Sequence, residues 1–346
     1  QRYMKEAVSV SNESPVLLDR FLDDAVEMDV DAVADGHEVQ VAGVMEHIEQ
    51  AGVHSGDSAC SLPPYSLPAV VVEEIKRQTK LMAEALNVVG LMNVQFAVQH
   101  AHSENPVIYV LEVNPRASRT VPFVSKATGN PVAAIAARVM AGQTLAEQGV
   151  NLEVTPRYVS VKEAVFPFSK FLGVDPVLGP EMRSTGEVMG VGRDFGEALF
   201  KSQLAAGSRL PERGSVFISV RECDKPKAVV CAHQLHQAGF PLVATAGTAH
   251  VIQQAGIPCR TVGRIGDAAG DVIGMMEAGD ITLVIMSVAE HEGELNDARA
   301  IRKLALAKQI TYYTTMAGGL AASEGIRHMR SVQVYDLQGL HAGTLP

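Results

Sequence analysis

The sequence predicts two consecutive units, an α+β unit built on an antiparallel sheet and an α/β unit built on a parallel sheet. Residues 26–48 alternate apolar and polar side chains on both sides of Asp35-Gly36, a dipeptide typical of tight hairpin turns. From about residue 216 onward, short β-rich runs alternate with helical segments, which is the pattern of βαβ units. A small, polar stretch at residues 205–208 separates the two patterns. We therefore expect a first domain over residues 1–206 and a second over residues 207–346.

The first unit is expected to begin with the hairpin, whose alternation places Glu27, Asp29 and Asp31 on one face. Further helices are expected over residues 68–86 and 130–142, and strands around Gln95, around Glu112 and over residues 158–165. The polar connection at residues 101–106 should be a loop. The stretch that follows residue 165, up to Met189, contains several Gly and Pro residues, so we expect irregular structure there.

The second unit is expected to be a Rossmann-like parallel sheet. Its predicted strands are residues 216–220, 241–245, 260–262, 281–286, 310–314 and 332–335. In such sheets a ligand binds at the carboxyl ends of the strands.

Composition narrows the class of protein. The chain has 346 residues, of which 47% are apolar and 20% charged, with a formal net charge of −10. The negative charge argues against general affinity for nucleic acid, and no apolar run is long enough to cross a bilayer. The first segment lacks the apolar centre of a signal peptide, so we expect a cytoplasmic protein. The four cysteines show no C-x-x-C spacing, which favours neither a zinc site nor a disulfide framework.

The strands around Gln95 and Glu112 carry the most informative pattern. Because side chains alternate along a strand, Glu112, Asn114 and Arg116 share one face. The residues expected to face a core are Leu111 and Val113. If Gln95 lies opposite, an acid and two amides converge, and such oxygen ligands suit Mg²⁺ bound to ATP phosphates. The alternative for an isolated E-x-N pattern is a strand with a solvated polar face.

Residues 45–58 are dense in hydrogen-bond donors and acceptors and include two glycines. Their position between the hairpin and the metal strands favours a binding loop, although a solvated turn has the same composition. Residues 190–196 superficially suggest a dinucleotide fingerprint. We reject it, because the spacing is wrong and we expect no strand-to-helix turn there.

In the second unit, Thr245-Ala246-Gly247-Thr248 lies between a predicted strand and a predicted helix, where backbone N–H groups and hydroxyls could hold a phosphate. Thr315 and Gly318-Gly319 occupy a comparable turn. Either turn could instead be a simple N-cap. Lys225 and Arg264 would add positive charge, although such residues alone are most often solvated.

Five stretches give the chain a close resemblance to the C-terminal third of the carbamoyl phosphate synthetase large-subunit family. They are residues 15–19, 45–60, 90–96, 112–128 and 179–190. The resemblance covers essentially the whole chain. It implies most of the later portion of the second ATP-grasp unit, up to about residue 206, followed by an allosteric domain of methylglyoxal-synthase type.

In that family the second ATP-grasp unit phosphorylates carbamate with MgATP. This is the last step of a synthesis from bicarbonate, glutamine-derived ammonia and two ATP, which serves arginine and pyrimidine biosynthesis. The resemblance implies ATP, Mg²⁺ or Mn²⁺, and K⁺ as cofactors. It also implies a glutaminase small subunit as partner and a homo-oligomer of the full heterodimer.

Site residues are carried over by motif. Gln95, Glu112 and Asn114 match metal-holding positions, and Glu112 and Asn114 are also counted as catalytic. Arg116 and Arg119 match arginines suited to stabilising the transferring phosphoryl group. The positions that match nucleotide contacts are Leu22, Glu27, Gly52, Val53, His54, Ser55, Gln95 and Glu112. The positions that resemble a potassium site are Glu27, His47, Gln50, Val53 and Ser58.

Effector positions are implied in the same way. Those matching an ornithine site are Glu49, Asp57, Glu163 and Thr314, and those matching the phosphate and ribose of uridylate or inosinate are Lys225, Thr245, Thr248 and Arg264. Arg264 stands where a lysine is usual. Met286 and Val288 stand where an amide and a hydroxyl are usual, so we expect nucleotide control to be absent or to differ in preference.

The resemblance further implies that the lid-side subdomain of the ATP-grasp unit lies upstream of Gln1. We therefore expect no carbamoyl phosphate synthesis by this polypeptide alone. Two alternatives are a different ATP-grasp ligase, such as a biotin-dependent carboxylase, and a regulatory module that only senses ornithine or a nucleotide. The appended βαβ domain and the loop at residues 47–58 speak against the carboxylase.

Overall fold

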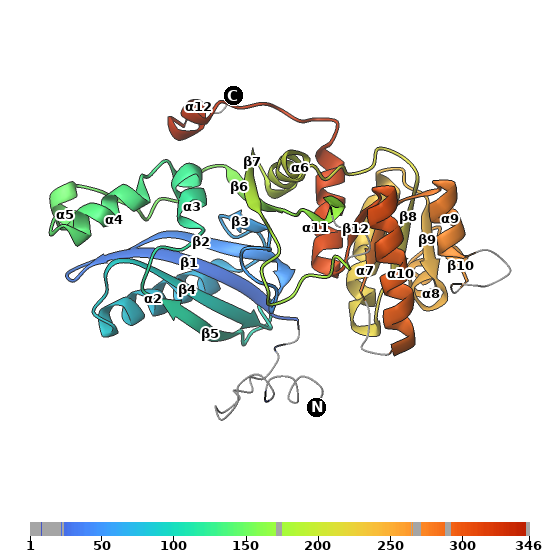
Figure 1. The fold of residues 1–346 in the computed structure, drawn as a ribbon, viewed down its shortest axis with the longest axis horizontal. Helices are drawn as coiled ribbons and strands as arrows, with labels where there is room; N and C mark the ends of the chain where they lie inside the picture. The colour runs from blue at the N-terminus through green and yellow to red at the C-terminus, as the bar shows by residue number, and fades with distance from the viewer. Residues whose placement is uncertain are drawn as a thin grey trace.

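The structure, a computed structural model, describes residues 24–170, 175–263, 271–287 and 292–343, together with Val8, Leu22 and Ile265. Within these residues the first unit is built on a seven-stranded antiparallel sheet and the second on a five-stranded parallel sheet (Figure 1). The predicted fold class is therefore confirmed. The division at residues 206 and 207 stays a prediction.

The first sheet has the strand order β5-β4-β1-β2-β3-β6-β7, and every neighbouring pair is antiparallel. Its strands are β1 (Val26–Asp35), β2 (Val39–Gln50), β3 (Cys60–Leu62), β4 (Val89–Gln99), β5 (Val107–Asn114), β6 (Val159–Val165) and β7 (Gly186–Gly192). Its helices are α2 (Ala69–Ala85), α3 (Val121–Thr128), α4 (Val132–Met140), α5 (Leu145–Gln148) and α6 (Phe195–Ala206). A short 3₁₀ turn, η1 (Phe168–Lys170), follows β6.

Helices cover both faces of this sheet. Ile75 of α2 packs with Val30 and Phe96 on one face, and Ile135 of α4 packs with Val33 and Met45 on the other. Burial of apolar area on both faces supplies the main stabilising free energy. The central strand β1 is consequently buried on both sides, and its polar face is not solvated.

The predicted hairpin is present and its turn has a clear local cause. Asp35 Oδ1 accepts the N–H groups of His37 and Glu38, each at 2.8 Å. Gly36 has φ +86°, a conformation that costs glycine little. The turn therefore fixes the register of β1 against β2.

Leu111 does not face a core, so that prediction was wrong. The register of β4 and β5 passes from Gln95↔Glu112 directly to Phe96↔Val110, which leaves Leu111 as the extra residue of a β-bulge. A bulge interrupts the alternation of side chains. Leu111 is 45% exposed, whereas Val113 packs against the core as predicted.

Two expectations for residues 186–196 were also wrong. Residues 186–189 belong to β7 and are not irregular, and β7 is joined to α6 by the strand-to-helix turn that we had excluded. Asp194 caps α6 by accepting the N–H of Glu197 at 3.0 Å. The glycines of β7 let the helix backbone approach the strand closely. The segment packs α6 against a strand of an antiparallel sheet, and the rejection of the dinucleotide fingerprint now rests on its spacing alone.

The second sheet has the order β10-β9-β8-β11-β12 and is parallel throughout. Its strands are β8 (Ser215–Ser219), β9 (Leu242–Thr245), β10 (Arg260–Val262), β11 (Ile281–Met286) and β12 (Thr311–Tyr313). Its helices are α7 (Lys225–Gln237), α8 (Ala246–Gln254), α9 (Val272–Ala278), α10 (Glu292–Lys308) and α11 (Met316–His328), and η2 (Glu222–Asp224) precedes α7. Among the described residues, no helix has both the length and the apolar character needed to span a bilayer.

Residues 332–335 form no strand, so the sixth predicted strand was wrong. They run back towards the first unit, where α12 (Leu337–His341) lies near α3 (Figure 1). His341 Nε2 lies 2.8 Å from the carbonyl oxygen of Lys126. The C-terminal segment therefore returns from the second unit to contact the first.

The two units are joined by a shared apolar contact. Ile48 of β2, Val161 of β6 and Leu199 of α6 pack with Ala321 of α11. In Figure 1, α6 and α11 stand between the two sheets. The sites described below are placed on either side of this junction.

Candidate active site

A pocket of about 370 Å³ opens on the first sheet beside β1, β4 and β5. Gln95 is paired with Glu112 across β4 and β5, and Gln95, Glu112 and Asn114 all line the pocket. Asn114 Nδ2 donates to Glu112 Oε1 at 2.8 Å. The predicted convergence of one acid and two amides is therefore present. Such an oxygen set fits a hard divalent ion that takes further ligands from water and phosphates.

The loop at residues 52–55 lies on the same pocket. Gly52, at φ +98°, directs its N–H to Glu27 Oε2 at 3.3 Å. Gln95 Nε2 donates to Ser55 Oγ at 3.1 Å, which ties the loop to β4. All four predicted nucleotide-contacting residues of this loop line the pocket, as does Glu27. Leu22 does not line it, and packs instead against Ala25, Ala51 and Ala97.

Arg116 and Arg119 also line the pocket, from the segment between β5 and α3. Arg116 Nη2 lies 3.4 Å from Asn114 Oδ1, and its Nη1 donates to the carbonyl oxygen of Ala117 at 3.1 Å. Arg119 contacts the Met182 sulfur. Two guanidinium groups thus face the same space as the acid and amides, an arrangement suited to binding and polarising phosphate.

Buried charges lie beneath this polar surface. His47 Nε2 is 3.0 Å from Asp29 Oδ2. Burial alone would raise the pKa of Asp29, but the hydrogen bond and charge of His47, the hydrogen bond from Asn93 and the charge of Lys162 together outweigh it, and the pKa is lowered. Burial alone would lower the pKa of His47, but Cys60 and Asp29 outweigh it and the pKa is raised. Asp29 and His47 therefore form a charged pair at neutral pH.

Lys162 of β6 is 1% exposed and lines the pocket from the opposite side. Its Nζ donates to the carbonyl oxygen of Ser55 at 3.1 Å. Burial by itself would lower the pKa of Lys162, but nearby acidic groups outweigh it and the pKa is raised. A charged lysine therefore holds the loop from below.

The structure brings together only part of the predicted potassium set. His47 Nδ1 is 3.9 Å from Glu27 Oε1, and burial raises the pKa of Glu27. Ser58 Oγ and His47 Nδ1 are buried and have no hydrogen-bond partner among the described residues. Gln50 lines a different cavity, between the two units. No cluster of three or more His, Cys, Asp or Glu side chains suited to a metal occurs in the described part of the chain.

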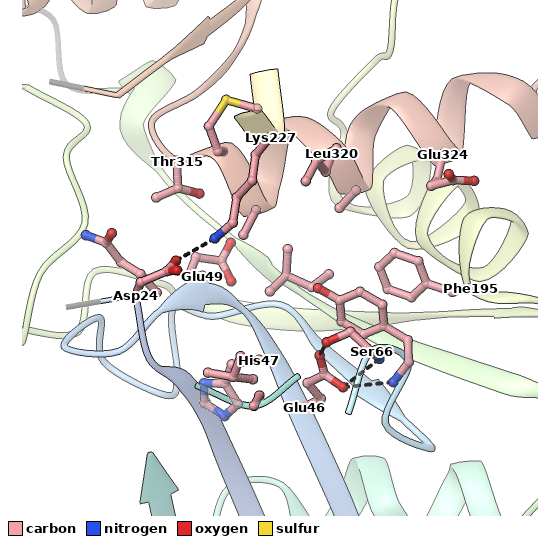
Figure 2. A pocket seen from close by; sticks show the side chains of 18 of the residues that line it. Asp24, Glu46, His47, Glu49, Ser66, Phe195, Lys227, Thr315, Leu320 and Glu324 are labelled. Carbon is pink, nitrogen blue, oxygen red and sulfur yellow. Dashed lines mark hydrogen bonds and ion pairs between the residues drawn. The ribbon is translucent and has the colours of Figure 1, made fainter. Parts of the chain in front are cut away.

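That second cavity, of about 1080 Å³, lies between the first sheet and the helices of the second unit (Figure 2). Of the predicted ornithine positions, Glu49 and Thr314 line it. Glu163 is half-buried nearby, and burial together with the charge of Glu49 raises its pKa to about 8. Burial likewise raises the pKa of Glu49 to about 6.

Asp57, the remaining predicted ornithine position, makes hydrogen bonds outside this cavity. Its carboxylate accepts the N–H groups of Arg183 and Ser184, each at 2.8 Å, and it does not line the cavity. The segment at residues 175–185 makes two further bonds to the loop after β2, from His54 N to Gly179 O and from Ser184 Oγ to Gly56 O. Its other end is held by α10 of the second unit. Arg302 there forms a two-bond ion pair with Asp175, each bond at 2.8 Å, and Arg299 adds a contact at 3.3 Å.

In the second unit, β9 ends at Thr245 as predicted, but α8 begins at Ala246 and not near Ala249, so Gly247 and Thr248 lie in its first turn. Thr245 Oγ1 lies 3.0 Å from Ser219 Oγ, and Thr248 Oγ1 accepts the N–H of Val220 at 3.2 Å. Lys225 Nζ lies near Gly247 and pairs with Glu222. The structure thus brings together three of the four predicted residues. Arg264 and Val288 lie outside the described residues, and Met286 is buried in the core.

The turn at Thr315 is the simple N-cap that was left open as an alternative. Thr315 Oγ1 accepts the N–H of Gly318 at 3.1 Å at the start of α11. A Cβ on Gly319 would lie 2.6 Å from Ile285, so this glycine serves close packing.

Sequence reasoning missed several residues of the pocket. Asp29, Asn93, Ser118, Thr120 and Lys162 line it in addition to the predicted set. The alternation of β1 had placed Asp29 and Asp31 on one face with Glu27, which was the available signal. No sequence signal indicated that Lys162 of β6 would line the same pocket.

Comparisons with known proteins agree on one family. The model "Carbamoyl-phosphate synthase L chain, ATP binding domain" matches residues 1–148, and the model "MGS-like domain" matches residues 227–314. The carbamoyl phosphate synthase large chain of Ralstonia nicotianae is 64% identical over 342 residues, covering 99% of this chain and 32% of the relative. That of Pasteurella multocida is 55% identical over 341 residues, covering 99% and 32%.

The chain thus spans about a third of the length of these curated relatives. Among solved structures, the biotin carboxylase domain of a single-chain bacterial carboxylase is 17% identical, with a TM-score of 0.44 over 60% of this chain and 57% of that one. This likeness is weak.

Proposed function

Because the chain belongs to the carbamoyl phosphate synthase large-chain family and comprises an ATP-binding domain followed by an MGS-like domain, we propose that its first unit phosphorylates carbamate. A carbamate oxygen attacks the γ-phosphorus of ATP, the bond to the bridging oxygen breaks, and ADP leaves with carbamoyl phosphate as the other product. The observation that carries this proposal is the single pocket shared by Glu112, Gln95, Asn114, Arg116 and Arg119.

Each group has a role that follows from its chemistry. Mg²⁺ or Mn²⁺ would be held by Glu112, Asn114 and Gln95, and would neutralise charge on the phosphates. Arg116 and Arg119 would stabilise the transferring phosphoryl group, because phosphoryl transfer depends mainly on positioning and electrostatics. The loop at residues 52–55, whose backbone is held by Lys162 and Glu27, would contact the nucleotide.

A potassium ion is part of the proposal. Ser58 Oγ, which is buried without a hydrogen-bond partner among the described residues, supports a bound group in this region. The Glu27 carboxylate would be the charged ligand. The raised pKa of His47 places a positive charge close by, so Ser58 and Glu27 are better suited than His47 to contact the ion.

Regulation and assembly complete the proposal. Ornithine would bind the cavity between the units, where Glu49 and Thr314 are exposed to it, and its amino groups would meet carboxylates. Uridylate or inosinate would bind the Thr245, Thr248 and Lys225 turn. Burial of Met286 removes it as an effector contact, which supports an altered nucleotide preference. The glutaminase small subunit would be the protein partner of the full large chain.

Calorimetry with a Mg-nucleotide tests the catalytic assignment. Glu112→Gln should weaken Mg-dependent nucleotide binding by about tenfold or more. Even mutation of a residue that only orients a metal ligand typically lowers metal affinity by about 10–100-fold. Glu104→Gln, the same charge change in an exposed loop, is the matched control. The proposal would be contradicted if Glu112→Gln bound the Mg-nucleotide as tightly as the unmutated chain does, or if removing Mg²⁺ left the nucleotide affinity of the unmutated chain unchanged. Ornithine binding without any nucleotide binding would favour the regulatory module.

A further inference from the structure

Asp31 lies in the middle of β1, is 1% exposed, and does not itself line the pocket. Both oxygens of its carboxylate nevertheless accept side-chain hydrogen bonds. Oδ1 accepts Asn93 Nδ2 at 2.9 Å and Ser118 Oγ at 2.7 Å, and Oδ2 accepts Thr120 Oγ1 at 2.6 Å. Ser118 Oγ also lies 2.7 Å from Thr120 Oγ1. One buried carboxylate thus binds two hydroxyls from the short segment between β5 and α3.

Thr120 gives up a local interaction to make this contact. It stands at the N-cap of α3, where a threonine hydroxyl normally accepts a backbone N–H of the first turn, but no such bond is present. A cap of this kind normally stabilises a helix. A residue that departs from a local rule while making a long-range bond is a candidate for a functional constraint.

The segment that these bonds hold is the one that carries the two arginines of the pocket. Arg119 lies between Ser118 and Thr120 in the sequence, and Arg116 precedes them by two residues. Neither arginine forms an ion pair with a carboxylate among the described residues, whose ion pairs all involve other cations. Apart from the contacts of Arg116 with Asn114 and Ala117 and of Arg119 with Met182, their placement depends on the backbone of the segment.

We infer that Asp31 is a positioning residue for phosphoryl transfer, acting through Ser118 and Thr120 to hold Arg116 and Arg119 towards the transferred group. The inference rests on the proposed function of the pocket. Burial raises the pKa of Asp31 to about 6, so the carboxylate is charged at neutral pH and accepts strong, charge-assisted bonds from the two hydroxyls. A misplacement of about 1 Å at such a site can cost about 10²-fold in rate.

The test measures the reverse of the proposed step in the full-length large chain that contains this region. An oxygen of the ADP β-phosphate attacks the phosphorus of carbamoyl phosphate, and carbamate leaves as ATP forms. Thr120→Val keeps the shape of the side chain and removes the hydroxyl, and should lower kcat about tenfold or more with KM for MgADP within about threefold. Thr120→Ser keeps the hydroxyl and should retain kcat within about threefold. Asp31→Ala should lower kcat as much as Thr120→Val does. If Asp31→Ala does not fold, the comparison of Thr120→Val with Thr120→Ser decides the test.

Asp35→Asn is the matched control. Asp35 ends the same strand and accepts the N–H groups of His37, Glu38 and Leu145, without touching the arginine segment. Its kcat should be unchanged. The inference is overturned if Thr120→Val keeps more than a third of kcat, if Thr120→Ser loses as much as Thr120→Val, or if KM changes in place of kcat.

Arg119→Ala in the same assay separates the two proposals. If Arg119→Ala leaves kcat unchanged, the proposed function of the pocket fails, and the inference fails with it. If Arg119→Ala removes activity and Thr120→Val does not, only the inference about Asp31 fails.

Discussion

Gly190 lies where β7 and α6 touch backbone to backbone, and its replacement by alanine tests how this contact holds the helix. A Cβ on Gly190 would lie 2.1 Å from the carbonyl oxygen of Ala198 and 2.3 Å from the nitrogen of Ser202. Real Cβ contacts essentially never fall below 3.0 Å, so α6 would have to move by about 1 Å. Both opposing atoms belong to the helix backbone and cannot rotate away.

Overpacking a core typically costs about 1–3 kcal/mol, occasionally more. We expect Gly190→Ala to lower the free energy of unfolding by about 3 kcal/mol, because α6 also supplies Leu199 to the contact between the units. Urea denaturation measures this as a lower midpoint with an unchanged slope. Gly186→Ala in the same strand is the control, since a Cβ there has nothing within 4 Å. Equal midpoints for Gly190→Ala and Gly186→Ala would refute the reasoning.

Two further predictions concern charged groups at the junction of the units. The pKa of Glu163 is raised from 4.5 to about 8, so its protonated form stabilises the fold fully below pH 4.5, and this contribution is lost as the pH rises to about 8. Urea denaturation between about pH 5 and pH 8 should therefore show the unmutated chain losing stability relative to Glu163→Gln, and parallel pH profiles would contradict the assignment. Arg302→Ala should lower the free energy of unfolding by about 2 kcal/mol, because its ion pair with Asp175 is largely buried and has two bonds. Arg299→Ala, whose side chain is 61% exposed, should cost less than about 1 kcal/mol, and an equal loss in both variants by the same measurement would show that burial is not the cause.

The elements that sequence reasoning placed best are those whose signal is local. The strands β10 and β11 have the predicted bounds because short β-rich runs between helical segments mark buried parallel strands. The strand β7 was missed because Gly186, Gly190 and Gly192 lower its strand propensity, and the approach of α6, which explains Gly190 and Gly192, is visible only in the structure. The position of Leu111 could not be predicted, since a single-residue bulge leaves no trace in the pattern of residues.

In the site, too, residues close together in the sequence were predicted, whereas contacts between distant residues were not. The resemblance placed the acid, the amides and the arginines in one pocket, because these residues come from two consecutive strands and the segment after them. The support beneath them comes from residues far apart in the chain, and Asp31 could be assigned to a face but not to its partners Ser118 and Thr120. Likewise, nothing in the sequence indicated that the Asp57 carboxylate would accept hydrogen bonds from the N–H groups of Arg183 and Ser184.

The segment at residues 175–185 works as a tether between the two halves of the molecule. The guanidinium of Arg302 holds it on the side of the parallel sheet, and four bonds fasten it to residues 54–57 at the edge of the pocket on the first sheet. If α10 tilts, it must either release Asp175 or pull these residues. Movement in the C-terminal half therefore has a mechanical route to the loop after β2 that does not pass through the seven-stranded sheet.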